Sequence, residues 1–296
     1  MSVMQTRKDA RTGNLRSHGQ ISLMVRRFVR NKAAVIALVF IILLVLSAIF
    51  SDVLTPYEYD AQSLKERFLD PSSEHLFGTD NFGRDILTRI LRGGRISLLV
   101  SVISVAISTC IALVIGSIAG YFGGKVDSVI MRITDIFMSL PGMLFAMTVS
   151  AALGGGILNT AIALAITSVA PLTRQIRASI LLLRDQEFIE ASKAFGGNHA
   201  HIIARHVMPN ALAPLIVQIS LRLGDTIMAI SGLSFLGLGI QPPTPEWGNM
   251  ISVGREFMTE HLHMVLFPAL AIILTMLAFN LLGDGLRDAM DPRMKR

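Results

Sequence analysis

The chain has 296 residues, of which 52% are hydrophobic and 16% charged, and its formal net charge is +6. Because soluble globular domains carry about 25% charged residues, this composition excludes an ordinary water-soluble protein. The basic residues lie beside apolar blocks, and Tyr and Trp are scarce, so the positive charge indicates an anionic membrane surface and no nucleic acid. The one cysteine, Cys110, lies in an apolar run and excludes a disulfide within the chain.

Six apolar segments are long enough to cross a bilayer, whose hydrocarbon core of about 30 Å requires about 20 helical residues. They cover residues 33–50, 96–122, 133–153, 157–172, 215–236 and 262–282. The first is longer than the core of a signal peptide and precedes no small-residue cleavage site, so we expect an uncleaved helix. The sequence therefore predicts an all-α integral membrane protein with six transmembrane helices.

Lys and Arg are distributed asymmetrically between the connecting segments. With the N-terminus in the cytoplasm, cytoplasmic segments hold 19 of the 27 basic residues and external segments hold 7. Both termini are therefore predicted to be cytoplasmic. The predicted domains are a cytoplasmic tail, a first transmembrane helix, a periplasmic segment with an interfacial helix, a five-helix core and a second cytoplasmic tail, covering residues 1–32, 33–50, 51–95, 96–285 and 286–296.

Residues 21–30 have two open interpretations, an amphipathic helix lying along the inner membrane surface or a disordered basic tail. Turn residues in 77–98 precede a short amphipathic helix, which we expect at the outer interface; its apolar side consists of Ile86, Leu87, Ile90 and Leu91. In the second membrane helix, Gly116, Gly120 and Gly124 follow one another at intervals of four. This spacing favours close approach of another helix, whose identity the sequence does not give.

Pro141 lies within the third membrane helix and removes a backbone hydrogen bond there, so we expect a kink. The kink would serve either gating or simple packing. On the fifth membrane helix, Arg222 and Asp225 are three residues apart and therefore share a face. Because a lone charge in the bilayer centre costs about 2.5–3.5 kcal/mol, these two residues either line a wet substrate path or form a structural ion pair.

The cytoplasmic stretch 185–210, which we call the coupling loop, contains two predicted short helices, 187–195 and 199–207, separated by Gly196-Gly197 and followed by Pro209. Two short helices with a glycine turn make a compact knob that can dock in a groove on another protein.

Two later stretches complete the pattern. Paired prolines, Pro242 and Pro243, predict an extended turn that shapes the outer mouth of a pore, with Trp247 at the outer interface, where tryptophan is favoured. Near the C-terminus, four charged residues are spaced about one helical turn apart and are predicted to cap the last helix: Asp284, Arg287, Asp288 and Asp291.

Several chemistries are excluded by missing patterns. The residues around Gly124-Lys125 lack the upstream glycine and the Ser/Thr of a nucleotide-binding loop, so any ATP must bind to another chain. His199 with His201, and His261 with His263, have no Cys or carboxylate companion nearby in sequence, so no metal site is predicted. No membrane helix carries the residues of an intramembrane hydrolase, and no catalytic residues are predicted.

The spacing of the coupling loop resembles the "EAA" loop of binding-protein-dependent ABC importer permeases. Glu190, Ala191 and Ser192 are followed after three residues by Gly196 and after nine more by a segment ending in Pro209. The sequence departs from the family pattern at three positions, which are Ser192, His206 and Met208. Residues 77–98, 234–250 and 280–292 resemble the peptide/nickel-type permeases, and the likeness, which covers about residues 30–296, is strongest to the second, "C-type" permease subunit.

This resemblance implies the ABC type I importer permease fold in the bacterial inner membrane. It implies that Glu190, Ala191 and Ser192 contact an ATPase, that Gly196 permits the turn and that Pro209 directs the chain back to the membrane. The implied partners are a paralogous permease forming a heterodimer, two ATPase subunits that bind ATP and Mg²⁺, a periplasmic substrate-binding protein and membrane lipid.

The substrate implied by the resemblance is a dipeptide or oligopeptide, and the chain itself has no cofactor. Nickel, glutathione or another small solute is the alternative within the family. An ion-coupled carrier or channel is a remote alternative, because such a protein needs titratable groups along its path and only Asp225, with Asp135 near the inner end, is available. An intramembrane enzyme is more remote still.

Overall fold

The computed structural model describes residues 22–184, 186–194, 196 and 198–290, and within these ranges it contains helices but no β-strand. Residues 22–30 are helical, which favours the first of the two interpretations of this stretch. The remaining elements are α2 (Lys32–Ile49), α3 (Ser51–Leu54), η1 (Leu64–Glu66), α4 (Ile86–Phe122), α5 (Gly124–Met138), α6 (Gly142–Leu153), α7 (Ile157–Arg184), α8 (Glu187–Ala194), α9 (His199–Ile202), η2 (Ile203–Val207), α10 (Met208–Phe235), α11 (Trp247–Gly254), η3 (Arg255–Phe257) and α12 (His263–Met290).

Five of the described helices, α2, α4, α7, α10 and α12, are long and apolar enough to cross a membrane. The pair α5 and α6 passes the same test together, which brings the total to the predicted six. The helices α4, α7, α10 and α12 extend beyond the predicted spans, because polar helical turns continue the apolar segments at their ends. The prediction of an all-helical membrane protein is therefore confirmed.

The third predicted span is broken rather than merely kinked. The axes of α5 and α6 differ by 83° across a short break that includes Pro141. Pro141 precedes the first residue of α6, a position where the missing amide hydrogen costs little because the first helical turn has no acceptor for it. The predicted kink thus takes the form of a change in chain direction.

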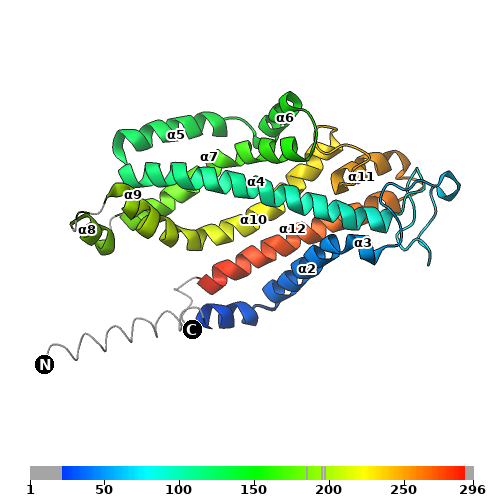
Figure 1. The fold of residues 1–296 in the computed structure, drawn as a ribbon, viewed down its shortest axis with the longest axis horizontal. Coiled ribbons are helices and arrows are strands. Elements are labelled where there is room, and N and C mark those ends of the chain that lie inside the picture. Colours follow the sequence, from blue (N-terminus) through cyan, green and yellow to red (C-terminus); the bar gives the residue numbers. More distant parts are fainter. Residues whose placement is uncertain (1–21, 185, 195, 197, 291–296) are drawn as a thin grey trace.

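The two ends of the helical bundle differ in structure (Figure 1). At one end lie α8 and α9, together with the beginning of α2 and the end of α12. At the other end lie α11 and the irregular residues 55–85, which we call the cap segment. All segments predicted to be cytoplasmic therefore gather at the α8 end, as far as the structure describes them, and the cap segment lies at the opposite end.

The predicted glycine contact forms between α4 and α7. A Cβ atom added to Gly116 would lie 2.9 Å from the carbonyl oxygen of Thr173, and one added to Gly120 would lie 2.9 Å from Cβ of Ile180. Only a residue without a side chain allows this approach, which is how helices gain packing energy in lipid. Gly124 meets nothing within 4 Å and has no part in the contact.

The separate interfacial helix expected within residues 51–95 does not form. Ile86 is instead the first residue of α4, and the Asp85 carboxylate caps this helix by accepting a hydrogen bond of 2.7 Å from the Thr88 amide. The apolar residues Ile86 and Ile90 are buried under the cap segment and α11, and this burial makes the amphipathic turn part of the bundle.

The last helix continues past the predicted end of its membrane span to Met290. Arg287 forms an exposed ion pair with Asp284 at 3.9 Å, and the predicted capping by this charged turn stays a prediction. Asp291 lies outside the described residues.

Candidate functional site

The coupling loop begins with the predicted short helix, α8, whereas the second predicted helix, 199–207, continues without a break into α10. After α8, Gly196 adopts φ +79°, which only glycine reaches without strain, and α9 then runs into the π-helical turn η2. Asp185, Phe195 and Gly197 of the predicted knob lie outside the described residues. The sequence pattern thus predicted α8 and the turn residue correctly, but not the continuity of the second helix with α10.

The loop is anchored by apolar side chains. Ile189, Ile202 and Val207 are completely buried and belong to one cluster with residues of α4, α7 and α10. In addition, the Tyr121 hydroxyl at the end of α4 hydrogen-bonds Nδ1 of His199 at 2.8 Å. The loop is therefore continuous with the core of the bundle.

The opposite side of the loop is open. Glu190 is exposed, Ser192 is half-buried, and the described surface around them is polar. Ala191 lies within α8, but its side chain is outside the described residues. Pro209 is exposed in the first turn of α10, where the pyrrolidine ring is tolerated. An exposed helix on a rigid base is suited to docking, and the contact with an ATPase stays a prediction.

Arg222 and Asp225 line a hollow of about 190 Å³ between α6, α7 and α10. Asp225 is exposed and Arg222 half-buried. Within the described part of the chain, neither charge forms an ion pair with the other or with a third residue. This arrangement supports the interpretation as a wet path more than that as a structural ion pair.

The break at Pro141 contributes to the same hollow. It turns α6 so that Gly142, Met143 and Ala146 form one wall, opposite Arg222 and Asp225 of α10. Sequence reasoning named Pro141 and the two charged residues separately, and the structure brings the elements that carry them together.

Trp247 does not lie at a membrane interface, so this part of the prediction is wrong. It is completely buried, its indole Nε1–H donates a hydrogen bond of 2.9 Å to the carbonyl oxygen of Ile90, and its ring packs on Gly93 and Gly94. Its role is to join α11 to α4. Pro242 and Pro243 are exposed at the cap end, and their place at a pore mouth stays a prediction.

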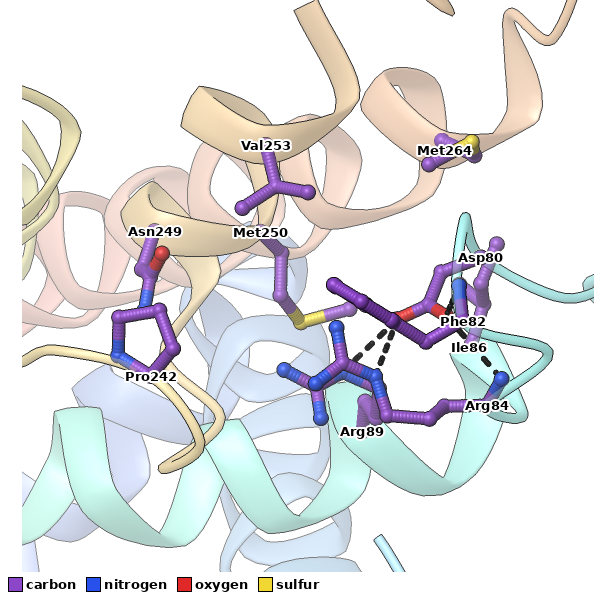
Figure 2. A pocket seen from close by; sticks show the side chains of 10 residues that line it. All are labelled: Asp80, Phe82, Arg84, Ile86, Arg89, Pro242, Asn249, Met250, Val253 and Met264. Atoms are coloured by element: carbon purple, nitrogen blue, oxygen red, sulfur yellow. Dashed lines mark hydrogen bonds and ion pairs between the residues drawn. The ribbon is translucent and has the colours of Figure 1, made fainter. Parts of the chain in front are cut away.

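A small pocket of about 50 Å³ lies beside Pro242, between the cap segment, α4 and α11 (Figure 2), and a cluster of charged residues forms part of its lining. Asp80 accepts a hydrogen bond of 2.7 Å from Nε of Arg84 and lies 3.6 Å from Nε of Arg89, and all three residues are buried. This paired cluster orders the cap segment over α4. The turn residues of the motif predicted a turn here, but no local pattern indicated that its charges are buried.

A second residue missed by sequence reasoning is Glu246, which is completely buried. Its carboxylate caps α11 through the Asn249 amide at 2.9 Å and accepts a hydrogen bond from the Ser231 hydroxyl at 3.1 Å. The sequence pattern predicted a turn at the prolines but no helix after it, so this helix cap was not identified.

Known protein families match most of the chain. Residues 112–296 match the family described as binding-protein-dependent transport system inner membrane component. Residues 19–71 match the N-terminal transmembrane domain of oligopeptide transport permease C.

Curated relatives extend this match over the whole bundle. The dipeptide transport system permease protein DppC of Alkalihalophilus pseudofirmus is 45% identical over 266 residues, which cover 90% of this chain and 88% of the relative. The glutathione transport system permease protein GsiD of Pectobacterium atrosepticum is 44% identical over 274 residues, which cover 91% of this chain and 90% of the relative.

A solved structure shows the same fold at low sequence identity. It is described as inward-facing conformations of the MetNI methionine ABC transporter, and it aligns with a TM-score of 0.56 and 16% identity over 69% of this chain and 97% of its own. The expected importer permease fold is therefore confirmed.

Proposed function

The chain belongs to the family of binding-protein-dependent transport system inner membrane components, and from this premise we propose that it forms half of the pathway by which an ABC importer carries short peptides across the bacterial inner membrane. As a permease subunit it works with other transporter subunits and makes or breaks no substrate bond. The proposed partners are a paralogous permease, two ATPase subunits that bind ATP and Mg²⁺, and a periplasmic binding protein.

The observation that carries the proposal is the coupling loop. It presents Glu190 to solvent while Ile189, the preceding residue, is completely buried in the core of the bundle. A partner that moves α8 would thereby move α4, α7 and α10 as well. Alternating access needs such a connection between the ATP-driven subunit and the helices that line the path.

The positions of the described chain ends support a cytoplasmic location of the loop. The beginning of α2, the end of α12 and α8 lie at the same end of the bundle (Figure 1), and most Lys and Arg residues of the described ranges belong to segments at this end. By the positive-inside rule, we propose that this end lies in the cytoplasm and the cap segment in the periplasm.

The hollow at Arg222 and Asp225 supports a zwitterionic substrate. The two relatives are named for dipeptide and glutathione transport, and both compounds carry carboxylate and ammonium groups. A guanidinium and a carboxylate on one face of α10 offer one opposite charge to each group. None of the described residues that line the hollow is His or Cys, which disfavours nickel as the cargo.

Cross-linking tests the coupling role. In a chain whose Cys110 is replaced by alanine, Glu190→Cys should cross-link to an ATPase subunit in membranes that contain the whole transporter. Glu260→Cys, which is exposed at the cap end, is the matched control and should not react with that subunit. Absence of any ATPase cross-link at Glu190, with the complex intact, would reject the proposal.

Peptide uptake tests the substrate. Arg222→Gln and Asp225→Asn should each lower uptake of a labelled dipeptide at least about 10-fold, because a hydrogen bond to a charged group contributes about 1.5–3 kcal/mol. The complex should assemble in normal amounts. Unchanged dipeptide uptake by both variants would show that the hollow does not bind the peptide.

A further inference from the structure

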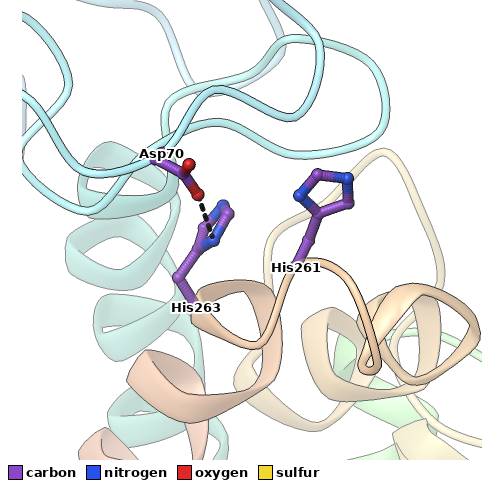
Figure 3. Close-up of side chains that lie close together, drawn as sticks. All are labelled: Asp70, His261 and His263. Carbon is purple, nitrogen blue, oxygen red and sulfur yellow. Dashed lines mark ion pairs between the residues drawn. The ribbon is translucent and has the colours of Figure 1, made fainter.

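Three potential metal ligands meet where the cap segment covers the beginning of α12 (Figure 3). Asp70 comes from the cap segment, His261 from the loop before α12 and His263 from its first residue. One ligand atom from each lies within 4.8 Å of the other two. The sequence showed the two histidines without a carboxylate nearby, and the fold supplies one.

The environment of His263 orients its ring. Nε2 lies 3.4 Å from the carbonyl oxygen of Thr79, which can only accept a hydrogen bond, so Nε2 carries the proton. Nδ1 of the neutral ring then turns its lone pair toward Oδ1 of Asp70, 3.7 Å away. Two acceptors that face each other repel unless a cation lies between them.

His261 adds a third donor atom. Its Nδ1 is buried and has no hydrogen-bond partner among the described residues. The ring stacks on Phe68 of the cap segment at 4.5 Å, with 14° between the planes, which restricts its orientation. A buried polar atom without a partner destabilises the fold, and a bound ion would remove this cost.

We propose that Asp70, His261 and His263 bind one divalent transition-metal ion of the zinc class, which joins the cap segment to α12. Two imidazole nitrogens and a carboxylate are ligands that Zn²⁺ accepts, and water would complete the coordination. The hydrogen bond from Nε2 of His263 to a backbone carbonyl is the usual support of a metal-binding histidine. Asp70 is 86% exposed, so its side chain can rotate toward the ion.

This ion is a structural component and not the cargo. None of the three ligands lines the hollow at Arg222 and Asp225. The cap segment has little regular secondary structure of its own, and a link to α12 would hold it against the bundle. The rival state of the cluster is a proton on Nδ1 of His263, which forms an ion pair with Asp70 and leaves His261 without a partner.

The test uses the whole transporter, purified through a tag without histidine and stripped of metal with a chelator. Zn²⁺ is titrated against a chromophoric chelator, and Co²⁺ absorption reports the coordination number. Asp70→Asn and His261→Gln should each weaken Zn²⁺ binding about 10-fold or more, since even loss of a supporting group costs about 10–100-fold. Asp60→Asn, which changes an exposed carboxylate elsewhere in the cap segment, is the control and should bind Zn²⁺ as the original chain does.

Thermal unfolding gives a second measurement. Zn²⁺ should raise the unfolding temperature of the original chain and of Asp60→Asn but not that of Asp70→Asn, whose metal-free unfolding temperature should be unchanged because Asp70 is exposed. The proposal is overturned if the stripped transporter binds Zn²⁺ no more tightly than the double variant of Asp70 and His261, or if Asp60→Asn weakens Zn²⁺ binding as much as Asp70→Asn does.

Discussion

Replacing Gly120 with alanine tests whether the backbones of α4 and α7 are in direct contact. The added Cβ would lie 2.9 Å from both Cβ and Cγ2 of Ile180 and 3.0 Å from the carbonyl oxygen of Arg177. Since carbon atoms at optimal separation lie about 3.5–4.0 Å apart, the two helices would have to separate by roughly 0.5 Å. Neither neighbour can yield easily, because one is main chain and the other a buried β-branched side chain.

The expected cost follows from two opposing terms. Overpacking a well-packed contact costs about 1–3 kcal/mol. Alanine recovers up to about 1 kcal/mol, because glycine is the poorer helix former in a helix interior. We therefore expect a net loss of about 1–2 kcal/mol in the free energy of unfolding.

Thermal unfolding of the purified transporter in detergent measures this loss. Gly142→Ala is the matched control, because its added Cβ meets nothing within 4 Å and its backbone conformation suits any residue. The control should unfold at the original temperature or slightly above it, and Gly120→Ala clearly below. Equal unfolding temperatures for the two variants would refute the close contact between α4 and α7.

Two further substitutions probe contacts between distant segments. Trp247→Phe should lower the free energy of unfolding by about 2 kcal/mol, because it removes the hydrogen bond to Ile90 and leaves a cavity; a fully retained unfolding temperature would contradict this. Arg177→Lys should lower the free energy of unfolding by at most about 1 kcal/mol at about 150 mM salt, and by less in high salt. The reason is that lysine cannot make both hydrogen bonds of the guanidinium to the partly exposed Asp127. A larger loss that does not depend on salt would contradict this.

Local patterns were sufficient to predict the helices and the coupling loop. Apolar length indicates a membrane helix because the bilayer sets the required span. The turn at Gly196 depends on the backbone preference of a single residue, which can be read from the sequence. These features arise within short stretches of chain and need no knowledge of neighbouring elements.

Contacts between distant segments could not be predicted in the same way. Tryptophan is a residue type that is favoured at membrane interfaces, but Trp247 is buried because Gly93 and Gly94 leave room for its ring on α4. Asp70 joins His261 and His263 only through the path of the cap segment. Spacing along the chain therefore identified the elements of the candidate site, and tertiary packing decided which side chains meet.

The burial of Ile189 has a mechanical consequence. A surface loop without buried contacts could move independently of the bundle. The Ile189 side chain of α8, in contrast, packs in the same cluster as Ile180 of α7 and Leu215 of α10. We therefore expect α8 to move together with these helices, so that any bending occurs elsewhere in the chain. The break between α5 and α6 is a place where the chain can bend. It borders the hollow at Arg222 and Asp225, which movement of α8 would have to widen or narrow.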